Sequence, residues 1–260
     1  MASTSELKPL ILYTSRLFPS APPNILPLTN PSTAGGPNPF KVVIILEELQ
    51  LPFTYDVTLF QDMKSPDFPI IHKNPNGRAP ALEDPNNQGF VVAESGAIIQ
   101  YLIDTYDKEN RLTNGSTGLN HHRENQWLHI QMSGQGPYFG QAMWFGRYHP
   151  VDVPSAKKRY LDEIIRVLGV LDKHLEKREW LVGEKITYVD LAFVPWDYWF
   201  INHILPAHGK EGEWEKIKAD APNWWRWHQK MMERPSVKTA EAFVTKLREE
   251  QKPGPGVPGQ

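Results

Sequence analysis

Two stretches of the sequence decide the fold: NPNGRAPAL at residues 74–82 and ESGAIIQYL at residues 94–102. In the first, the Ala79–Pro80 step leads into a short apolar strand. A cis bond at this step would turn the backbone N–H and C=O of Ala79 outward, where an extended peptide can pair with them. Because only about 5–6% of X–Pro bonds in folded proteins are cis, an ordinary turn before a strand is the competing interpretation.

The second stretch begins with Glu94 and Ser95, and Ser95 opens a helix. The N–H groups at a helix N-terminus can hold a carboxylate, and the carboxylate of Glu94 can pair with an ammonium group. The two residues together suit a ligand that carries both groups. A plain serine N-cap is the other interpretation of the same residues.

The sequence on either side of these stretches alternates strands and helices. Residues 39–49 carry apolar side chains at helical spacing, with Asn38 as the expected N-cap and Pro39 in the first helical position. Strands joined by such a helix form a βαβ unit, which is normally parallel. We therefore predict an α/β domain of the thioredoxin type, ordered β-α-β and then β-β-α, with strands at 10–14, 53–59, 79–82 and 89–93 and helices at 39–49 and 95–106.

The second half of the chain is expected to be helical throughout. All nine tryptophans fall after residue 126, and this shift in composition indicates a second domain. Thr187 and Asp190 have the spacing of a capping box. We expect a thioredoxin-like domain over residues 1–108, an all-helical domain over 119–252 and a disordered tail over 253–260. The expected helices of the second domain are 121–144, 154–178, 187–203, 221–233 and 236–250.

The composition excludes several classes of protein. Lys+Arg is 28 and Asp+Glu is 30, so the formal net charge of −2 gives no support to nucleic-acid binding. Cysteine is absent, which excludes disulfides, thiolate metal sites and a cysteine nucleophile, and the nine histidines show no metal-ligand spacing. The longest uncharged stretch, residues 17–40, contains seven prolines and cannot be a membrane helix. Because the N-terminus also lacks an apolar signal core, we expect a cytoplasmic protein that contacts no membrane.

The two opening stretches resemble the glutathione-binding half of the cytosolic glutathione transferases. The likeness continues in the same order and spacing along the chain, over roughly residues 8–14 and 36–245. It is closest to the nitrogen-regulator-like, or nu-class-like, branch of that superfamily. The further stretches that carry it are GPNPFKVVIILEELQLPF at 36–53, QWLHIQMSGQGPYFGQAMWFGRYHP at 126–150, RVLGVLDKHLEKREWLVGEKITYVDLAFVPW at 166–196 and NWWRWHQKMMERPSV at 223–237.

The resemblance implies a bound glutathione and assigns its contacts. Glu94 and Ser95 would hold the γ-glutamyl group, and the backbone of Ala79 would pair with the cysteinyl part. Arg78 would lie near the carboxylates, and Lys64 would bind the glycine carboxylate. The branch usually has Ile or Val in place of the alanine, and often has His just before the lysine, where this sequence has Met.

The thiol of glutathione must become a thiolate to act as a nucleophile. In the branch that this sequence resembles, the Asn of a TPNG-like motif points at the sulfur, and residues 36–39, GPNP, are the equivalent here. The resemblance therefore implies Asn38 as the catalytic donor, with Thr14 or Ser15 as a secondary donor. The hydroxyl residue of the motif is replaced by glycine, which puts activation in question.

In the family, the first long helix of the helical domain faces the sulfur and lines the pocket of the second substrate. Aromatic side chains there suit an apolar, aromatic electrophile, although tryptophan and phenylalanine in a helical domain are more often core. The candidates on this helix are Tyr138, Gln141, Trp144, Phe145 and Arg147.

The resemblance implies a homodimeric glutathione transferase, with glutathione as co-substrate and no metal. It would add the glutathione thiolate to a small apolar electrophile in detoxification, or reduce a disulfide. One alternative is a biosynthetic glutathione-dependent enzyme of secondary metabolism, either an isomerase or an enzyme that forms C–S bonds. The other alternative is a non-catalytic glutathione-binding regulator, which the altered motif at residues 36–39 favours.

Residues 15–35 are an insertion of roughly twenty residues against the family pattern, placed just before Asn38. Loops longer than about 12–15 residues are usually functional or disordered. We hold three interpretations: a lid over the second-substrate pocket, a passive loop, or the translation of an unspliced intron.

Overall fold

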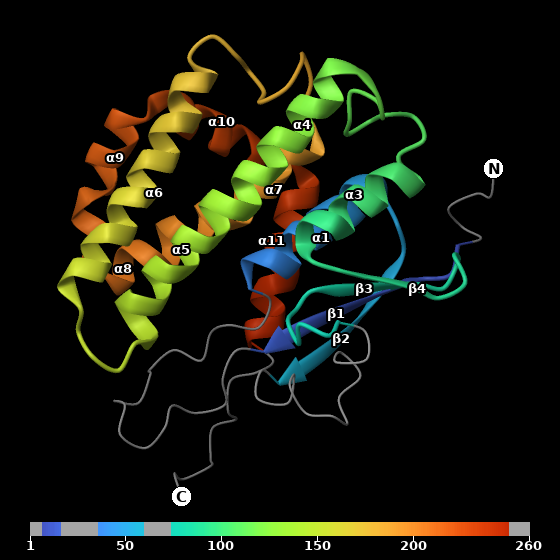
Figure 1. The fold of residues 1–260 in the computed structure, drawn as a ribbon, viewed down its shortest axis with the longest axis horizontal. Helices are drawn as coiled ribbons and strands as arrows, with labels where there is room; N and C mark the ends of the chain where they lie inside the picture. Colours follow the sequence, from blue (N-terminus) through green and yellow to red (C-terminus); the bar gives the residue numbers. More distant parts are fainter. Residues whose placement is uncertain (1–6, 17–35, 60–73, 250–260) are drawn as a thin grey trace, which may run out of the picture. The chain divides into compact units, whose positions relative to one another are not determined.

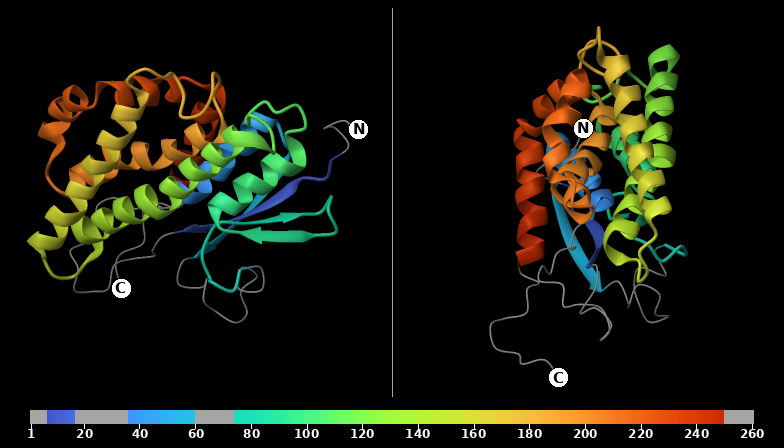
Figure 2. Two further views of the ribbon diagram at one scale, coloured as in Figure 1. Left: turned by 45° about the horizontal axis from the view of Figure 1, so that its top comes forward. Right: turned by 90° about the vertical axis from the view of Figure 1, so that its left-hand side faces the viewer.

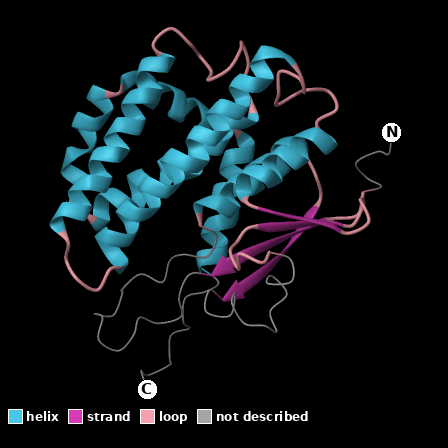
Figure 3. Ribbon diagram, viewed as in Figure 1, coloured by secondary structure: helices cyan, strands magenta, loops and turns pink. Residues whose placement is uncertain are grey.

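The computed structural model of this chain describes residues 7–16, 36–59 and 74–249. The chain divides into two compact units. Unit 1 consists of Met1–Tyr101 and Pro235–Gln260, and unit 2 consists of Leu102–Arg234. The strands belong to unit 1, whereas the described part of unit 2 contains helices and loops (Figure 3).

Unit 1 is built on a four-stranded sheet with the strand order β2-β1-β3-β4 (Figure 1). β1, Leu10–Arg16, runs parallel to β2, Phe53–Leu59. β3, Ala81–Asp84, runs antiparallel to β1 and to β4, Phe90–Ala93. A mixed sheet in this order confirms the thioredoxin-like fold that the sequence predicts.

Three helices accompany the sheet: α1, Pro37–Leu49; α3, Ser95–Tyr106; and α11, Pro235–Glu249. α11 packs along α1, as Figures 1 and 2 both show. Its Phe243 ring also lies 4.9 Å from the ring of Tyr55 on β2. Because α1 is covered on several sides, it is buried on almost every face, and its apolar residues do not form the single stripe of a surface helix.

The start of α1 corrects one prediction. The N-cap is Gly36, not Asn38, and the carbonyl of Gly36 accepts the N–H of Phe40 at 3.2 Å. Asn38 is the second residue of the helix. The reason is that Pro37 occupies the first helical position, where its missing N–H and fixed φ cost nothing, so Pro39 comes third.

Unit 2 confirms the helical character of the second half (Figure 2). π-helical segments break two of the long helices that the sequence predicts, and α9 is a helix that it does not predict. The α-helices are α4 Gly118–Ile130, α5 Gly136–Met143, α6 Pro154–Leu175, α7 Tyr188–Trp199, α8 Leu205–Ala207, α9 Trp214–Asp220 and α10 Pro222–Met232. The π-segments are Gln131–Gln135, Trp144–Tyr148 and Phe200–Ile204, and a 3-10 turn at Glu211–Glu213 leads into α9.

The capping box at the start of α7 is confirmed. The side chains and backbone N–H groups of Thr187 and Asp190 satisfy each other reciprocally, and Asp190 is completely buried. Among the helices in the described ranges, none is both long enough and apolar enough to cross a membrane.

Candidate functional site

A pocket of about 380 Å³ opens in unit 1. Its walls come from three separate parts of the chain: the start of α1, the segment before β3 and the junction of β4 with α3. Five residues that the sequence proposes for a glutathione site are thus brought together. The residues that line the pocket are Asn38, Asn76, Arg78, Ala79, Pro80, Glu94 and Ser95.

A tight turn builds the wall before β3. The buried side chain of Asn74 accepts the N–H of Asn76 at 3.0 Å and donates to the carbonyl of Arg78 at 2.6 Å. Gly77 has a φ of 60°, which glycine adopts without strain. The turn delivers the chain to Ala79–Pro80, whose peptide bond is cis, so the first of the two interpretations of this step is confirmed.

The opposite wall is the junction before α3. Glu94 has a φ of 70°, a left-handed conformation that residues other than glycine rarely adopt. The side-chain amide of Asn76 donates to the Oε1 of Glu94 at 3.3 Å. The backbone carbonyl of Glu94 accepts the first helical N–H, from Ile98, at 2.9 Å. Glu94 therefore occupies the N-cap position, and Ser95 stands one residue inside the helix. A plain N-cap is thus not the role of Ser95.

The start of α1 supplies a polar group to the same pocket. Asn38 is half-buried there and lines the pocket. Because Pro37 and Pro39 have no N–H, Asn38 provides the backbone donor among the first three residues of α1. Its backbone amide therefore belongs to the positive end of the helix dipole, and its side-chain amide is carried by the same first turn.

Lys41 is a buried charged residue that the sequence analysis did not single out. Its side chain lies inside unit 1, 1% exposed, and its Nζ donates to the Oγ of Ser95 at 3.3 Å. Burial lowers the pKa of Lys41 to about 7, and the charge of Glu94 acts in the opposite direction. The available signal was a lysine inside the apolar run FKVVII, because lysine is almost never fully buried without a partner.

The secondary donors proposed for the thiol are less well supported. Thr14 is buried in β1, and its Oγ1 has no hydrogen-bond partner among the described residues, but Thr14 does not line the pocket. The side chain of Ser15 and the whole of Lys64 lie outside the described residues. Tyr13 is a core aromatic: its hydroxyl donates to Glu83 at 2.9 Å, and burial, helped by that hydrogen bond, raises its pKa to about 12.

In unit 2, the five proposed second-substrate residues lie on α5 and the π-segment that follows it. The ring of Phe145 stacks on Tyr160 at 5.6 Å and on His149 at 4.9 Å. Trp144, 42% exposed, lies edge-to-face to His149. Tyr138 also faces Tyr160, at 6.5 Å. We call Tyr138, Trp144, Phe145, His149 and Tyr160 the aromatic surface; Gln141 is exposed and Arg147 is half-buried.

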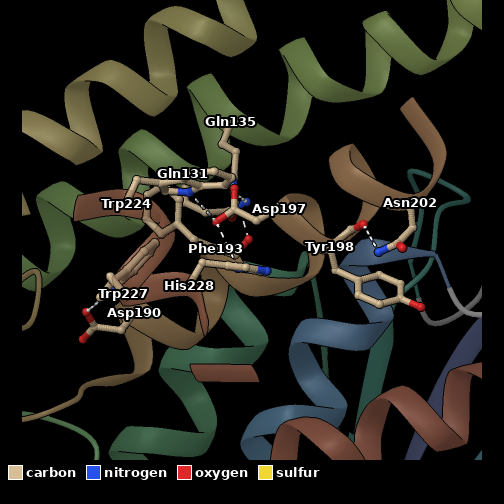
Figure 4. A network of polar contacts seen from close by, with 10 residues as sticks. All are labelled: Gln131, Gln135, Asp190, Phe193, Asp197, Tyr198, Asn202, Trp224, Trp227 and His228. Carbon is tan, nitrogen blue, oxygen red and sulfur yellow. Dashed lines mark hydrogen bonds and ion pairs between the residues drawn. The ribbon is translucent and has the colours of Figure 1, made fainter. Parts of the chain in front are cut away.

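A second set of polar side chains lies wholly in the core of unit 2 (Figure 4). Gln135 donates to Asp197 at 2.7 Å, and Trp224 donates to the other oxygen of Asp197 at 3.1 Å. Because its amide is taken up by this buried network, Gln135 acts in the core. Among the described residues, no three His, Asp or Glu side chains gather as metal ligands would.

Comparisons with known protein families agree with this geometry. Residues 35–105 match the family model "Glutathione S-transferase, N-terminal domain", and residues 139–235 match "Glutathione S-transferase, C-terminal domain". The chain belongs to the glutathione transferase family. The first match contains every residue that lines the pocket, and the second contains most of the aromatic surface.

Relatives place the chain in the Ure2-like, or nitrogen-regulator-like, branch of the glutathione transferases. It is 42% identical over 230 residues to the glutathione S-transferase-like protein tpcF of Aspergillus fumigatus, with 85% of this chain and 98% of that protein covered. It is 36% identical to Protein URE2 of Candida albicans, with coverage of 80% and 68%. The crystal structure of glutathione transferase URE2P6 from Phanerochaete chrysosporium, in complex with oxidized glutathione, superposes with a TM-score of 0.77 at 39% identity, with 94% and 100% covered.

Two residues of the pocket region escaped the sequence analysis for different reasons. Asn76 belongs to the quoted motif NPNGRAPAL, but no role was predicted for it, and the structure shows that its side chain reaches Glu94. Lys41 lies within the predicted helix 39–49 but belongs to no motif, and only the packing of α1 shows that its side chain is buried.

Proposed function

We propose that this glutathione transferase binds glutathione in the unit 1 pocket and adds its thiolate to a small apolar electrophile, or uses it to reduce a disulfide. The observation that carries the proposal is the convergence of Asn38, Arg78, Ala79, Glu94 and Ser95 on one pocket. The relatives and the neighbour solved with oxidized glutathione support glutathione as the ligand.

The two walls of the pocket suit the γ-glutamyl end and the cysteinyl middle of glutathione. The carboxylate of Glu94 can pair with the γ-glutamyl ammonium, while Ser95 and the N-terminus of α3 bind the adjacent carboxylate. Arg78 supplies a positive charge for a carboxylate of the tripeptide. The backbone N–H and C=O of Ala79, next to the cis bond, can pair with the cysteinyl residue as one strand pairs with another.

Asn38 is the residue that we assign to the sulfur. It donates through its amides at the positive end of α1, so it stabilises the thiolate over the thiol and lowers the thiol pKa without accepting the proton. The thiol proton is released to solvent. The thiolate then forms a C–S bond with the electrophile and displaces its leaving group, or attacks a disulfide sulfur to form a mixed disulfide and release the second sulfur as a thiolate.

The aromatic surface of unit 2 supports an aromatic second substrate. Stacked and partly exposed rings favour flat apolar molecules through offset stacking. Gln141 and Arg147 would add polar contacts to such a molecule.

A glutathione-binding regulator without turnover is the second candidate. The residues of the 36–39 motif favour it, because Gly36, Pro37 and Pro39 bring neither a hydroxyl nor a thiol to the start of α1. The buried Thr14 does not replace them at the pocket wall.

Retention on immobilised glutathione, followed by turnover assays, separates the two candidates. The assays use 1-chloro-2,4-dinitrobenzene as an electrophile and 2-hydroxyethyl disulfide as a disulfide. Retention with turnover that falls in Asn38→Ala supports the enzyme. Retention without turnover on a broad panel of electrophiles and disulfides supports the regulator. If the protein is not retained and free glutathione does not bind in calorimetry, both candidates are wrong.

The family resemblance also leads us to propose a cytoplasmic homodimer. Light scattering coupled to size-exclusion chromatography measures the molar mass, and a mass of one chain at micromolar concentration would contradict it.

A further inference from the structure

Lys41 has surroundings that are unusual for a lysine. It is 1% exposed, and it lies on α1 among Phe40, Val42 and Val43, each of which is fully buried. Burying an ammonium group without partners is costly. A lysine in such a position therefore has to be held by polar neighbours, and the neighbour that faces the pocket is Ser95.

The hydrogen bond between these residues has only one possible direction when Lys41 is protonated. An ammonium group has three donors and no lone pair, so the Oγ of Ser95 must accept from Nζ across the 3.3 Å between them. The proton of the Ser95 hydroxyl is then directed to a different acceptor. Ser95 lines the pocket, where the proposed ligand presents a carboxylate.

We propose that Lys41 is a positioning residue for ligand recognition: from inside the core, its ammonium holds Ser95 as an acceptor and thereby turns the Ser95 O–H toward the carboxylate of the bound ligand. Lys41 also adds a positive charge behind the N-terminus of α3. The inference rests on the proposed glutathione site and specifies which end of the ligand the buried lysine serves.

The charges around Lys41 make this role sensitive to pH. Glu94, at the start of α3, is an ionisable group whose charge acts on Lys41. Arg78 lines the same pocket, and Glu47 and Glu48 lie about two turns further along α1. With a pKa of about 7, Lys41 is partly deprotonated at pH 7.5 before the ligand binds.

In the proposed complex, only the Ser95 hydroxyl separates the ligand's carboxylate from the Nζ of Lys41. The ligand's ammonium group is farther away, because it pairs with the carboxylate of Glu94. The nearer negative charge stabilises the ammonium form of Lys41. Binding should therefore take up a proton at pH 7.5, about half a proton per site, and should weaken as the pH rises from 6.5 to 8.5.

Calorimetry with S-methylglutathione tests this inference, because the blocked thiol removes the titration of the sulfur. Titrations at pH 7.5 in phosphate and in Tris, which differ in ionisation enthalpy, give the number of protons taken up. The variants are Lys41→Met, which removes the charge, and Lys41→Arg, which keeps it at every pH. Histidine side chains as a class change charge in this pH range, so His72→Asn, at a histidine of unit 1 outside the described residues, is the matched control.

We expect proton uptake in the wild type and in His72→Asn, and clearly less in either Lys41 variant, where the ligand's own amino group still titrates. Lys41→Met should bind roughly tenfold more weakly, whereas the affinity of Lys41→Arg should change less between pH 6.5 and 8.5 than that of the wild type. Wild-type binding without proton uptake overturns the role of Lys41 and leaves the glutathione site intact. If the wild type does not bind S-methylglutathione or glutathione, the proposed function itself is wrong. If circular dichroism shows that a Lys41 variant is unfolded, the wild-type proton count and pH profile still decide.

Discussion

Ser95 with Lys41 in unit 1, and Asp197 with His228 in unit 2, are both buried polar pairs, but only the first borders an opening. In unit 1 the serine forms part of a pocket wall, so the buried lysine has a path to a ligand. In unit 2 the Nδ1 of His228 lies 3.7 Å from the Oδ2 of Asp197, and both residues are closed off on all sides. A shifted pKa alone therefore does not mark a functional site; the shifted group must also reach a surface.

The unit 2 network is held together by neutral and hydrogen-bonded groups (Figure 4). Burial raises the pKa of Asp197 to about 8 and lowers the pKa of His228 to about 3. Near neutral pH both side chains are thus mostly uncharged. The indole N–H of Trp224 donates a hydrogen bond to Asp197. Such a network fixes the packing of the helices, and the comparison predicts that damage there costs stability, whereas damage in the pocket costs binding.

The largest effect is expected from Asp190→Ala. The buried carboxylate accepts the N–H of Leu181 at 2.9 Å, the indole N–H of Trp227 at 3.0 Å, and both the N–H and hydroxyl of Thr187. Its loss leaves several buried donors unpaired, so the free energy of unfolding should fall by about 3–5 kcal/mol. Urea denaturation measures this, with the exposed Asp220→Ala as control. A variant with normal stability but no turnover would show that Asp190 acts in catalysis and not in folding.

Substitutions in the pocket should weaken ligand binding and leave the free energy of unfolding almost unchanged. Ser95→Ala and Arg78→Ala should each weaken glutathione binding roughly tenfold to a hundredfold, the cost of a hydrogen bond to a charged group. In the proposed site both residues face the peptide and not the sulfur, so kcat should change little while KM rises. Steady-state kinetics with varied glutathione check this, with the exposed Arg123→Ala of unit 2 as control. An unchanged KM in both variants would remove this pocket as the glutathione site.

Protonation of His228 should lower the stability of the unit 2 network in acid, while Asp197 acts in the opposite direction over the same pH range. The pKa of His228 is lowered from 6.5 to about 3, so the folded state resists protonation. The stability that neutral His228 contributes is therefore present above pH 6.5 and is lost as the pH falls toward 3, by about 2 kcal/mol between pH 6.5 and 5. Asp197 has the opposite sign: its contribution is present below pH 3.8 and is lost as the pH rises through 8.

Urea denaturation at a series of pH values tests His228→Phe, which keeps a ring against Trp224, with the exposed His122→Phe as control. The stability of His228→Phe should fall less steeply between pH 6.5 and 5 than that of the wild type. Equal slopes would show that another group governs the acid response.

A smaller effect is expected from Asn38→Ala. Turnover should fall roughly tenfold and the thiol pKa of bound glutathione should rise by about one unit, because a donor to the thiolate is lost. Since Gly36 and not Asn38 is the N-cap of α1, the free energy of unfolding should change by less than about 0.5 kcal/mol. Absorbance of the thiolate during a pH titration of the complex measures the thiol pKa. A pKa equal to that of the wild type would exclude Asn38 from activation.

The sequence predicted the strands and helices well wherever hydrophobic periodicity was strong. β2 and α3 have the predicted bounds, Phe53–Leu59 and Ser95–Tyr106. In α3 the helical spacing follows the buried face, which includes Ile98 and Leu102. The cap of α1 was missed because two prolines each fit the first helical position, and only the backbone chooses between them. α9, WEKIKAD, was missed because its charged residues obscure the apolar period.

The sequence predicted most residues that line the pocket, but not the buried Lys41 behind them. Asn38, Arg78, Glu94 and Ser95 belong to local motifs, so their approach to one another follows once the fold is known. Lys41 depends on a contact across 54 positions, between α1 and the start of α3, and no local pattern encodes that contact.

The smallest effect on folding is expected from replacing residues 17–35, which lie outside the described residues, by a short Gly/Ser linker. Arg16 is kept because it is the last residue of β1. Changing the length of a loop costs only about 0.6 kcal/mol per doubling, and the N-terminal family match begins only at residue 35. The melting temperature should therefore stay within a few degrees of the wild type, and a large drop would show that the segment is part of the core.

If the segment is passive or a translated intron, turnover of 1-chloro-2,4-dinitrobenzene by the shortened protein should be equal or better. If it is a lid, glutathione binding should persist while activity toward the native electrophile is lost. Sequencing the transcript separates the passive loop from the translated intron, since a mature message that carries the whole stretch rules out the intron.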